Sequence, residues 1–535
     1  MEMWTPMAWL FMLEANLRRP IMKISGGRPM SAPSPVRYLL ALVFCSVLSP
    51  LAAAQSCESL RDFSLVNVEV NSTEQIAAGA FAPPGSNSNA ANRYETLPAF
   101  CRVQLTLTPT PDSDIKMELW LPADWNGKYL AVGNAAFTGF VRHSSMAMPL
   151  SRGYATSSTD TGHVGNTASF ALGHPQKVYD FAWRAVHEMA ETSKTLIDTY
   201  YDDRLQYSYF TGCSAGGRQA MKEAQRFPTD FDGIVAGAPG LDWTGRAASA
   251  LRIESHLLTN TAARLLRSDR ELLHRSALDF CDADDGVVDG LIGNPAQCSF
   301  DPEVLQCGDE NDGACLSSAK INTAKMIYSS PLNPSTGRAI TGLLPGSELG
   351  WTDLGWTQSA RATGLDQFRY LVYEDENFTI DQFNFEPASS AGEKKDDDTV
   401  NALSPDLFEF IAAGGKLIAY HGWSDPQISP ASATQYYERV SRVSGGRDAI
   451  HDSFRLFMAP GMGHCAGGPG PNSFDSLSAL ENWVEREQAP DRIDAVHRSN
   501  GVVDRSRPLC PFPEVAVYDG SGSTDEAGNF VCRAL

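Results

Sequence analysis

The sequence Thr211-Gly212-Cys213-Ser214-Ala215-Gly216-Gly217 contains the pattern Gly-x-Ser-x-Gly. A short apolar run at 207–210 precedes it and reads as a buried strand, and a helix-compatible segment follows from about Arg218 and stops before Pro228. A strand, a sharp turn and a helix are the context in which this pattern exposes a serine hydroxyl on a strained turn. Glycines flank the serine because the turn is tight and neighbouring strands pass close to it. We therefore expect Ser214 to be a nucleophile at the end of a strand.

Strands and helices alternate on both sides of this turn. Short apolar or alternating runs indicate strands, and a run that is apolar on one helical face indicates a helix. This alternation predicts an α/β fold with a mostly parallel sheet covered on both faces. The expected strands are 101–107, 116–121, 128–132, 154–157, 207–210, 233–239, 416–420 and 454–458, and the expected helices are 181–200, 218–226, 407–412 and 473–486.

The regular pattern weakens between residues 241 and 402. This block holds four clustered cysteines, aromatic patches and many Gly, Pro and Asn residues. Its acidic stretch at 393–398 is interpreted as a solvated loop. We interpret the block as a lid domain, 241–402, inserted above a catalytic domain that is built from 55–240 and 403–535.

Composition restricts the class of partner. The chain has 535 residues, of which 43% are hydrophobic and 20% are charged, and a formal net charge of −21. The hydrophobic and charged fractions are typical of a globular protein. The negative charge argues against nucleic acid and against anionic membrane surfaces as partners.

The N-terminus has the features of an export signal. Arg37 supplies positive charge, 38–48 is an apolar run, and three alanines at 52–54 form a small-residue cleavage site. The residues before Met30 are unusual for a signal, which a start codon assigned too early would explain. The apolar run is too short to span a membrane comfortably, and no run of about 20 apolar residues follows. We expect a signal peptide at 1–54, a secreted or periplasmic protein, and no membrane anchoring.

An activated serine needs a base, and the base needs an acid that orients it. Asp425 follows the strand expected at 416–420, and His464 follows the strand expected at 454–458. Both fall on loops after strands, in the order Ser, Asp, His of an α/β-hydrolase. His421 is a competing base, but it sits nearer to its strand. We expect Ser214, His464 and Asp425 to form a catalytic triad; the alternative is that Asp425 and His464 are ordinary loop residues.

The cysteines indicate disulfides. Of eleven cysteines, Cys45 lies in the expected signal, and the remaining even number is typical of an oxidising compartment. No Cys-x-x-Cys pair occurs, which argues against a structural zinc site. Cys213 precedes the serine and Cys465 follows the histidine, so they could bridge if Ser214 and His464 come within hydrogen-bond reach. Such a bridge would clamp the two loops; the alternative is five generic bridges without a role at the site.

These residues resemble the tannase and feruloyl esterase family. The family's marks are Cys-Ser, a distant Asp and His-Cys, which here are Cys213-Ser214, Asp425 and His464-Cys465. The resemblance implies an α/β-hydrolase core, an inserted lid and hydrolysis of esters of aromatic acids. It extends over nearly all the mature chain, through 124–127, 227–240, 463–470 and 507–511.

The resemblance also implies bonds and backbone roles that spacing alone does not select. An oxyanion needs two backbone N–H donors. One is Ala215, directly after the nucleophile, and the other lies in the loop 133–137, where alignment on residues 125–127 favours Ala136. The disulfides implied besides Cys213–Cys465 are Cys57–Cys101, Cys281–Cys298, Cys307–Cys315 and Cys510–Cys532.

The segment 281–291 resembles the family's calcium loop. Carboxylates that alternate with backbone carbonyls on a glycine-containing turn suit a hard cation such as Ca²⁺. The alternative is an acidic surface turn. We expect a structural ion in the lid, and the resemblance implies as its ligands the side chains of Asp282, Asp285 and Asp289 and the carbonyls of Val287 and Leu291.

The expected function is that of a secreted serine esterase that acts on a small aromatic ester, a hydroxycinnamic or hydroxybenzoic acid ester, through an acyl-enzyme. Alternatives are a tannase acting on gallate esters or a mono(2-hydroxyethyl) terephthalate hydrolase. A rival of another class is a non-catalytic binding protein with a hydrolase fold, and the same core also serves serine peptidases and acyltransferases.

The sequence does not define which aromatic acid is used, nor the oligomeric state. Aromatic residues of the lid are candidate walls of an acyl pocket or, equally, the lid's own core. Arg361 or Arg369 could hold a carboxylate or phenolate. The aromatic candidates are Trp351, Trp356, Phe368, Tyr370, Tyr373, Phe378 and Phe383.

Overall fold

The structure is a computed structural model that describes residues 56–84, 92–202, 204–308, 315–353 and 363–534. By its internal contacts the chain divides into two units, 1–51 and 52–535, and every element described belongs to the second. The expected signal peptide at 1–54, Trp356 and Arg361 lie outside the described residues.

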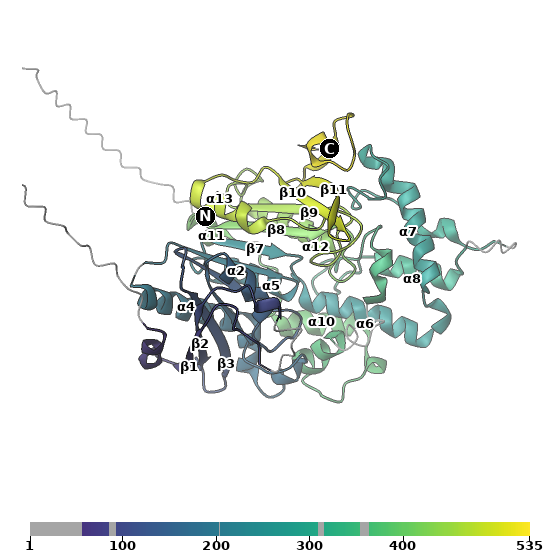
Figure 1. The fold of residues 1–535 in the computed structure, drawn as a ribbon. Helices are drawn as coiled ribbons and strands as arrows, with labels where there is room; N and C mark the ends of the chain where they lie inside the picture. Colours follow the sequence, from purple (N-terminus) through teal and green to yellow (C-terminus); the bar gives the residue numbers. More distant parts are fainter. Residues whose placement is uncertain (1–55, 85–91, 203, 309–314, 354–362, 535) are drawn as a thin grey trace, which may run out of the picture. The chain divides into compact units, whose positions relative to one another are not determined.

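A nine-stranded sheet forms the centre of the second unit, in the order β1-β2-β3-β5-β4-β6-β7-β8-β9. The pairs β1–β2, β2–β3 and β3–β5 are antiparallel, and all pairs from β5–β4 onward are parallel (Figure 1). With helices on both faces, this is the expected α/β-hydrolase fold. The strands are β1 Val68–Ile76, β2 Phe100–Leu107, β3 Ile115–Pro122, β4 Lys128–Val132, β5 Ala155–Thr159, β6 Tyr207–Cys213, β7 Gly233–Gly237, β8 Lys416–Gly422 and β9 Phe454–Ala459.

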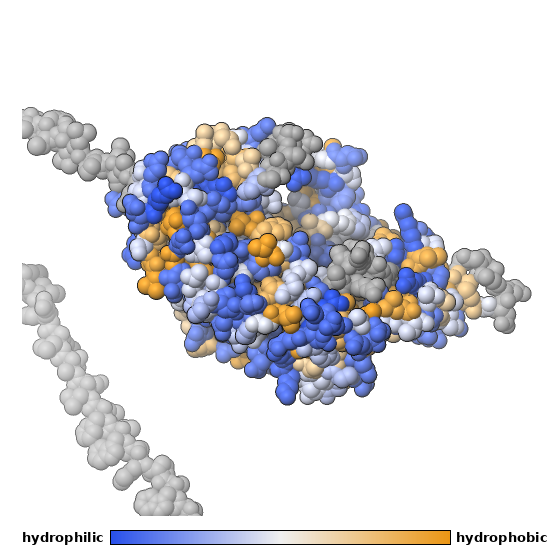
Figure 2. Space-filling view, turned by 90° about the horizontal axis from the view of Figure 1, so that it is seen from below, coloured by the Kyte–Doolittle hydropathy of each residue, from blue (hydrophilic) through white to orange (hydrophobic). Residues whose placement is uncertain are grey.

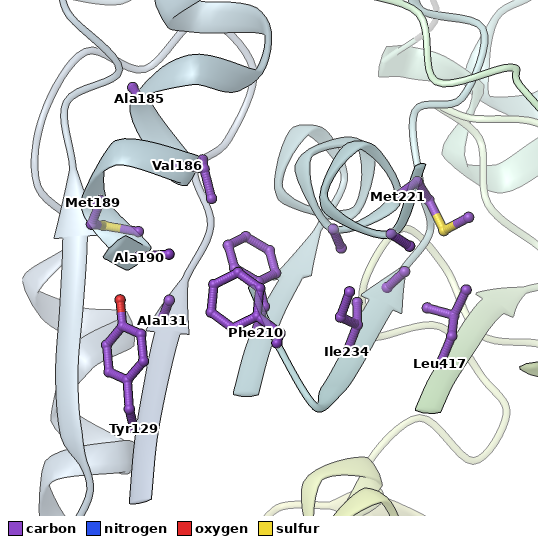
Figure 3. Packing of buried hydrophobic residues seen from close by; sticks show 14 of the residues in the cluster. Tyr129, Ala131, Ala185, Val186, Met189, Ala190, Phe210, Met221, Ile234 and Leu417 are labelled. Atoms are coloured by element: carbon purple, nitrogen blue, oxygen red, sulfur yellow. The ribbon is translucent and has the colours of Figure 1, made fainter. Parts of the chain in front are cut away.

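Successive side chains of the parallel strands enter two different cores, because side chains alternate between the faces of a sheet. Tyr129, Ala131 and Phe210 pack against helices α4 (Ala185–Tyr201) and α5 (Ala215–Arg226), as Figure 3 shows. Leu130 and Tyr209 enter the opposite core, beneath α13 (Ser476–Arg486). Burying a side chain such as Phe210 stabilises the fold by about 1.5–3 kcal/mol. The packed faces therefore hold the strand ends, where the expected site lies, in place.

Further elements complete the core. Helix α2 (His143–Ser151) covers the β3 side of the sheet, and α12 (Pro430–Val443) packs on the face of α5. Other elements are α3 Pro175–Tyr179, α11 Phe408–Ala412, the π turn η4 Asp180–Arg184, and two small antiparallel sheets, β10 Ile493–Ser499 with β11 Val502–Leu509 and β12 Val515–Tyr518 with β13 Phe530–Arg533.

The chain leaves the sheet after β7 and returns at β8, and the described residues between them contribute no strand to it. This intervening segment is helical, and its helices lie together at the right of Figure 1. It has two apolar clusters of its own, yet it remains in one contact unit with the core. The helices are α6 Trp243–Thr259, α7 Arg267–Cys281, α8 Ser318–Tyr328 and α10 Phe385–Asp396, with a π turn, η9 Gln367–Val372.

The expectation of a solvated loop at 393–398 is wrong. Residues 393–396 form the last turn of α10, and Asp396 is buried. Its carboxylate accepts the backbone N–H groups of Val400 and Asn401 at 3.0 Å each. A charge run identifies acidic residues, but it does not reveal that a following backbone turn supplies donors for them.

No helix among the described residues is both long and apolar enough to cross a bilayer. Figure 2 shows one face on which hydrophilic residues predominate and apolar residues form small separate patches.

A buried ion pair links β2 and β3. Arg102 Nε donates to Glu118 at 2.9 Å, Trp120 Nε1 donates to the same carboxylate at 2.9 Å, and His143 Nε2 lies 3.2 Å from it. Burial alone would raise the pKa of Glu118, but hydrogen bonds and charges from His143 and Arg102 lower it from about 4.5 to about 2. The folded state therefore favours the ionised form of Glu118.

We predict that Glu118→Gln lowers the free energy of unfolding at pH 7 by about 3 kcal/mol, since each unit of pKa shift corresponds to about 1.4 kcal/mol. Because the folded pKa is depressed, this stabilisation is complete above about pH 4.5 and is lost as the pH falls toward about 2. Urea unfolding at pH 7, 4.5 and 3 should show that the free energy of unfolding decreases less on acidification in the variant than in the wild type. The exposed Glu409→Gln serves as control, and parallel pH curves for Glu118→Gln and wild type would contradict the prediction.

Candidate active site

Ser214 lies at the junction between β6 and α5. Its backbone has φ 66° and ψ −119°, a left-handed conformation that a residue other than glycine rarely adopts. The helix begins at Ala215, earlier than expected from the sequence. A Cβ on Gly212 would lie 2.5 Å from the Gly216 carbonyl, so glycine is required there by close backbone approach. The turn has the geometry of a nucleophile elbow.

Asp425 and His464 lie side by side on the loops that follow β8 and β9. His464 Nδ1 is 2.7 Å from Asp425 Oδ2, and Asp425 is fully buried. The other carboxylate oxygen accepts the N–H groups of Gln427 and Ile428 at 2.8 and 3.0 Å. Although burial raises the pKa of Asp425, the charges and hydrogen bonds of His464 and His421 hold it well below its usual range. Asp425 is thus ionised and able to orient the imidazole of His464.

His421, the competing base, contacts the same acid. Its Nε2 lies 3.0 Å from Asp425 Oδ2 and 3.1 Å from the carbonyl of Ile428, and the side chain is fully buried. Its Nδ1 is buried without a hydrogen-bond partner. A ring held in this way supports the acid and has no free, accessible nitrogen with which to activate a serine. Sequence reasoning missed this supporting contact.

A disulfide ties the serine loop to the histidine loop. Cys213 and Cys465 are bonded, with their Cα atoms 5.9 Å apart. Within the described part of the chain the Ser214 hydroxyl has no hydrogen-bond partner, so the link from Ser214 to His464 is open in this structure. Catalytic hydrogen bonds are often long before substrate binds. The other four implied disulfides also form, namely Cys57–Cys101, Cys281–Cys298, Cys307–Cys315 and Cys510–Cys532.

The two backbone N–H groups that the sequence suggested as oxyanion donors, those of Ala215 and Ala136, have no hydrogen-bond acceptor among the described residues. Ala215 is the first residue of α5, so its N–H has no partner within the helix. Ala136 has φ 43° in a turn closed by Thr138 N–H donating to the Ala135 carbonyl at 2.8 Å. The described residues offer no acceptor for the Ala136 N–H. Both groups are therefore available to a ligand oxygen.

The loop that carries Ala136 is held from two sides. Gln219, on α5, accepts the backbone N–H of Asn134 at 2.8 Å. On the other side, His163 Nε2 lies 2.9 Å from the Phe137 carbonyl. Gln219 therefore connects the helix of one expected oxyanion donor to the loop of the other. Sequence reasoning missed these contacts because they join residues far apart in the chain.

Most of the aromatic candidates form the core of the lid. Phe368, Phe378 and Phe383 share one lid cluster, and Trp351 is fully buried in the other. Tyr373 is 38% exposed and packs on Phe378.

The apolar cluster next to the elbow has different members. It contains Ala215, Phe137 and Trp243, with Tyr370 at its edge. Arg369, which could hold a carboxylate, donates from Nε to the Phe378 carbonyl at 3.0 Å. The apolar packing beside the elbow therefore comes largely from residues that were not among the aromatic candidates of the lid.

The acidic loop of the lid folds back on its own backbone. Asp282 accepts the N–H groups of Asp289 and Gly290 at 3.1 and 2.9 Å, while Asp289 pairs with Arg507. Burial, and then the charges of Asp289 and Asp282, raise the pKa of Asp285 to about 6 against the opposing hydrogen bond of the Val287 N–H. No group of three or more acidic, His or Cys side chains in the described residues is arranged to hold a metal ion.

The similarity to known proteins extends over both the core and the lid. A family model described as tannase and feruloyl esterase matches residues 101–533. An uncharacterised esterase of Xanthomonas campestris is 37% identical over 91% of this chain and 92% of its own. Mono(2-hydroxyethyl) terephthalate hydrolase of Piscinibacter sakaiensis is 32% identical over 91% and 92% of the two chains. A crystal structure of feruloyl esterase B from Aspergillus oryzae matches with a TM-score of 0.83 at 30% identity, covering 89% of this chain and 99% of its own.

We predict that removing the Cys213–Cys465 bridge by Cys213→Ala with Cys465→Ala costs roughly 2–5 kcal/mol of unfolding free energy. The rate constant kcat for ester hydrolysis should fall by a larger factor than KM rises, because the serine loop and the histidine loop are no longer held in a fixed relative position. The control is Cys57→Ala with Cys101→Ala, which removes a bridge in the N-terminal part. It should destabilise the protein without lowering kcat at a temperature where both variants are folded, and equal kcat losses would contradict the prediction.

Proposed function

The chain belongs to the tannase and feruloyl esterase family and is a carboxylic ester hydrolase, and on this premise we propose that it cleaves esters of aromatic acids through Ser214, His464 and Asp425. The observation that carries the proposal is the 2.7 Å contact between His464 and the buried, ionised Asp425. This contact sits one residue from a disulfide whose other half precedes Ser214.

In the proposed mechanism Ser214 Oγ attacks the ester carbonyl while His464 Nε2 takes its proton. Asp425 holds the Nδ1–H tautomer and stabilises the imidazolium. His464 then protonates the leaving alcohol, which leaves an acyl-enzyme. Water attacks this ester with His464 as base, and the acid is released.

The negative charge that develops on the carbonyl oxygen requires donors. The N–H groups of Ala215 and Ala136 are proposed for this role, and each such donor contributes about 10²–10³ in rate. Their lack of partners in the described chain and the left-handed backbone at Ala136 support the assignment. Strained backbone of this kind is common at functional sites.

An aromatic acyl group is supported by the relatives and by the aromatic residues packed beside the elbow. The relatives include proteins named feruloyl esterase and mono(2-hydroxyethyl) terephthalate hydrolase. Phe137 and Trp243 are buried in one cluster with Ala215, so the elbow has aromatic surroundings, and these suit an aromatic ligand. A hydroxycinnamate ester is the preferred substrate class, and gallate or terephthalate esters are the second candidates.

Export is proposed from the disulfides. Five bridges form in the described chain, and disulfides persist in oxidising compartments. The protein is accordingly proposed to be secreted or periplasmic.

Calcium is proposed as a structural ion of the loop at 281–291. The donor set fits a hard cation, since Asp282, Asp285 and Asp289 offer carboxylate oxygens and Val287 and Leu291 offer carbonyls. Asp282 accepts the N–H groups of Asp289 and Gly290, so the backbone of the loop already curves around this carboxylate, which supports the proposal. Binding requires these carboxylates to turn toward one point, with Arg507 releasing or sharing Asp289.

Ser214→Ala is expected to lower the hydrolysis of p-nitrophenyl acetate and methyl ferulate by about 10⁴-fold or more. The fold should persist, because the hydroxyl has no partner in the described chain, and circular dichroism with thermal melting would verify this. Turnover retained by a folded variant would refute the assignment. A panel of methyl ferulate, methyl gallate and mono(2-hydroxyethyl) terephthalate should give its highest kcat/KM for methyl ferulate.

Chelation is expected to lower Tm. A ligand that binds only the folded state at 100 times its Kd contributes about 2.7 kcal/mol. The melting temperature should therefore fall when EDTA replaces calcium, and Asp285→Asn should remove that difference. Asp284→Asn changes a loop aspartate outside the proposed ligand set and should keep it. A Tm of the wild type that does not depend on calcium would contradict the proposed calcium site without affecting the esterase assignment.

A further inference from the structure

Arg246, on the lid helix α6, is a half-buried cation that no carboxylate of the described chain contacts. Its Nε donates to the Gln427 carbonyl at 2.7 Å, and its guanidinium lies 5.9 Å from the centre of the Trp243 ring. The terminal guanidinium nitrogens have no hydrogen-bond or ion-pair partner among the described residues. Burial lowers the pKa of Arg246, and the charge that opposes this effect is that of Asp425. That carboxylate is already engaged by His464 and His421.

A guanidinium that is partly withdrawn from water and has free N–H groups is suited to an anionic partner. Asp242, the nearest acidic residue along the helix, cannot serve as that partner, since it pairs with Arg338 and caps α6 through the Gly245 N–H. The terminal N–H groups of Arg246 are therefore free to bind a ligand.

A pocket opens at this guanidinium. Its volume is about 50 Å³, which is room for a few water-sized atoms. Two hydroxyls of its wall, those of Ser249 and Thr341, have no hydrogen-bond partner among the described residues. The remaining wall includes the apolar side chains of Ile253, Ile340 and Ile428, and also Asp242, whose charge is neutralised by Arg338. A cation, two free hydroxyls and an apolar rim suit a small anionic head group on an apolar body.

We propose that this pocket is a carboxylate site, separate from the catalytic serine, which binds the acid that the enzyme itself releases. Ester hydrolysis produces a carboxylate, so a ligand of the right charge forms at every turnover. A guanidinium recognises a carboxylate through paired N–H donors. None of the residues that line the pocket is Ser214, Ala215, Ala136 or His464.

The pocket adjoins the loop of the proposed catalytic acid. Arg246 holds the Gln427 carbonyl, and the Gln427 N–H holds Asp425 Oδ1 at 2.8 Å. A carboxylate that pairs with Arg246 competes with its hydrogen bond to the Gln427 carbonyl, and so displaces the loop that orients Asp425. Product should therefore lower kcat through this site, in addition to competing with substrate at the serine.

The test is inhibition of initial rates by benzoate with p-nitrophenyl butyrate as substrate. Benzoate should lower kcat in the wild type, whereas the neutral isostere benzamide and chloride at equal ionic strength should not. The kcat effect should weaken at least tenfold in Arg246→Met, which keeps the packing on Trp243, and persist in Arg246→Lys. Ser249→Leu, which fills the pocket without changing charge, should also remove it. Arg439→Met, a partly buried arginine stacked on Tyr436, is the matched control and should behave as wild type.

Three outcomes would overturn the proposal: purely competitive inhibition by benzoate in the wild type, an effect on kcat that survives in Ser249→Leu, or equal inhibition by chloride. Ser249→Leu keeps the test decisive if Arg246→Met does not fold. Acetate distinguishes the sources of the ligand, since an effect equal to that of benzoate would mean that any carboxylate serves and the aromatic product is not preferred. All arms use an active esterase, so the result is independent of which aromatic ester is the best substrate.

Discussion

The desolvated carboxylate of Asp425 is the constraint on which the rest of the site depends. An ionised group that is fully buried is tolerated only when donors surround it. Asp425 has four: the N–H groups of Gln427 and Ile428 on one oxygen, and His464 and His421 on the other. Each of these donors is placed by a strand end or by the turn that follows β8. The same contacts that keep the carboxylate charged also define where the imidazole of His464 lies.

On the other side of the site, unusual backbone conformations determine where the functional groups lie. Ser214, Ala136 and Cys465 all have positive φ, and each lies on a loop at the expected site. Such backbone persists only where the surroundings hold it. Here the Cys213–Cys465 bridge holds two of these loops together, and the Gln219–Asn134 hydrogen bond joins the third to the nucleophile helix. The disulfide and the hydrogen bond therefore restrict the motion of these loops before substrate binds, so that binding costs less conformational entropy.

The core of the fold could be predicted from local pattern, whereas the lid could not. Residues 128–132, 233–237 and 416–420 are short apolar runs between turn residues, and such runs specify buried strands with little ambiguity. The lid is helical, but its segments lack a regular apolar period, so its helices were not predicted individually. Asp396 shows the limit clearly, since its acidic context indicated a solvated loop, yet Val400 and Asn401 turn back to satisfy it.

By itself the sequence determined the α/β fold, the order of Ser214, Asp425 and His464, and the adjacency of two of them to cysteines, because strand period, turn chemistry and chain order are local properties. Only the tertiary structure decided that His421 supports the acid, that Gln219 braces the Ala136 loop, and that Arg246 lacks a carboxylate partner. It also decided that Phe368, Phe378 and Phe383 pack with one another within the lid. These are relations between side chains that lie close in space and far apart in the chain, and burial and hydrogen-bond satisfaction arise only when distant segments meet.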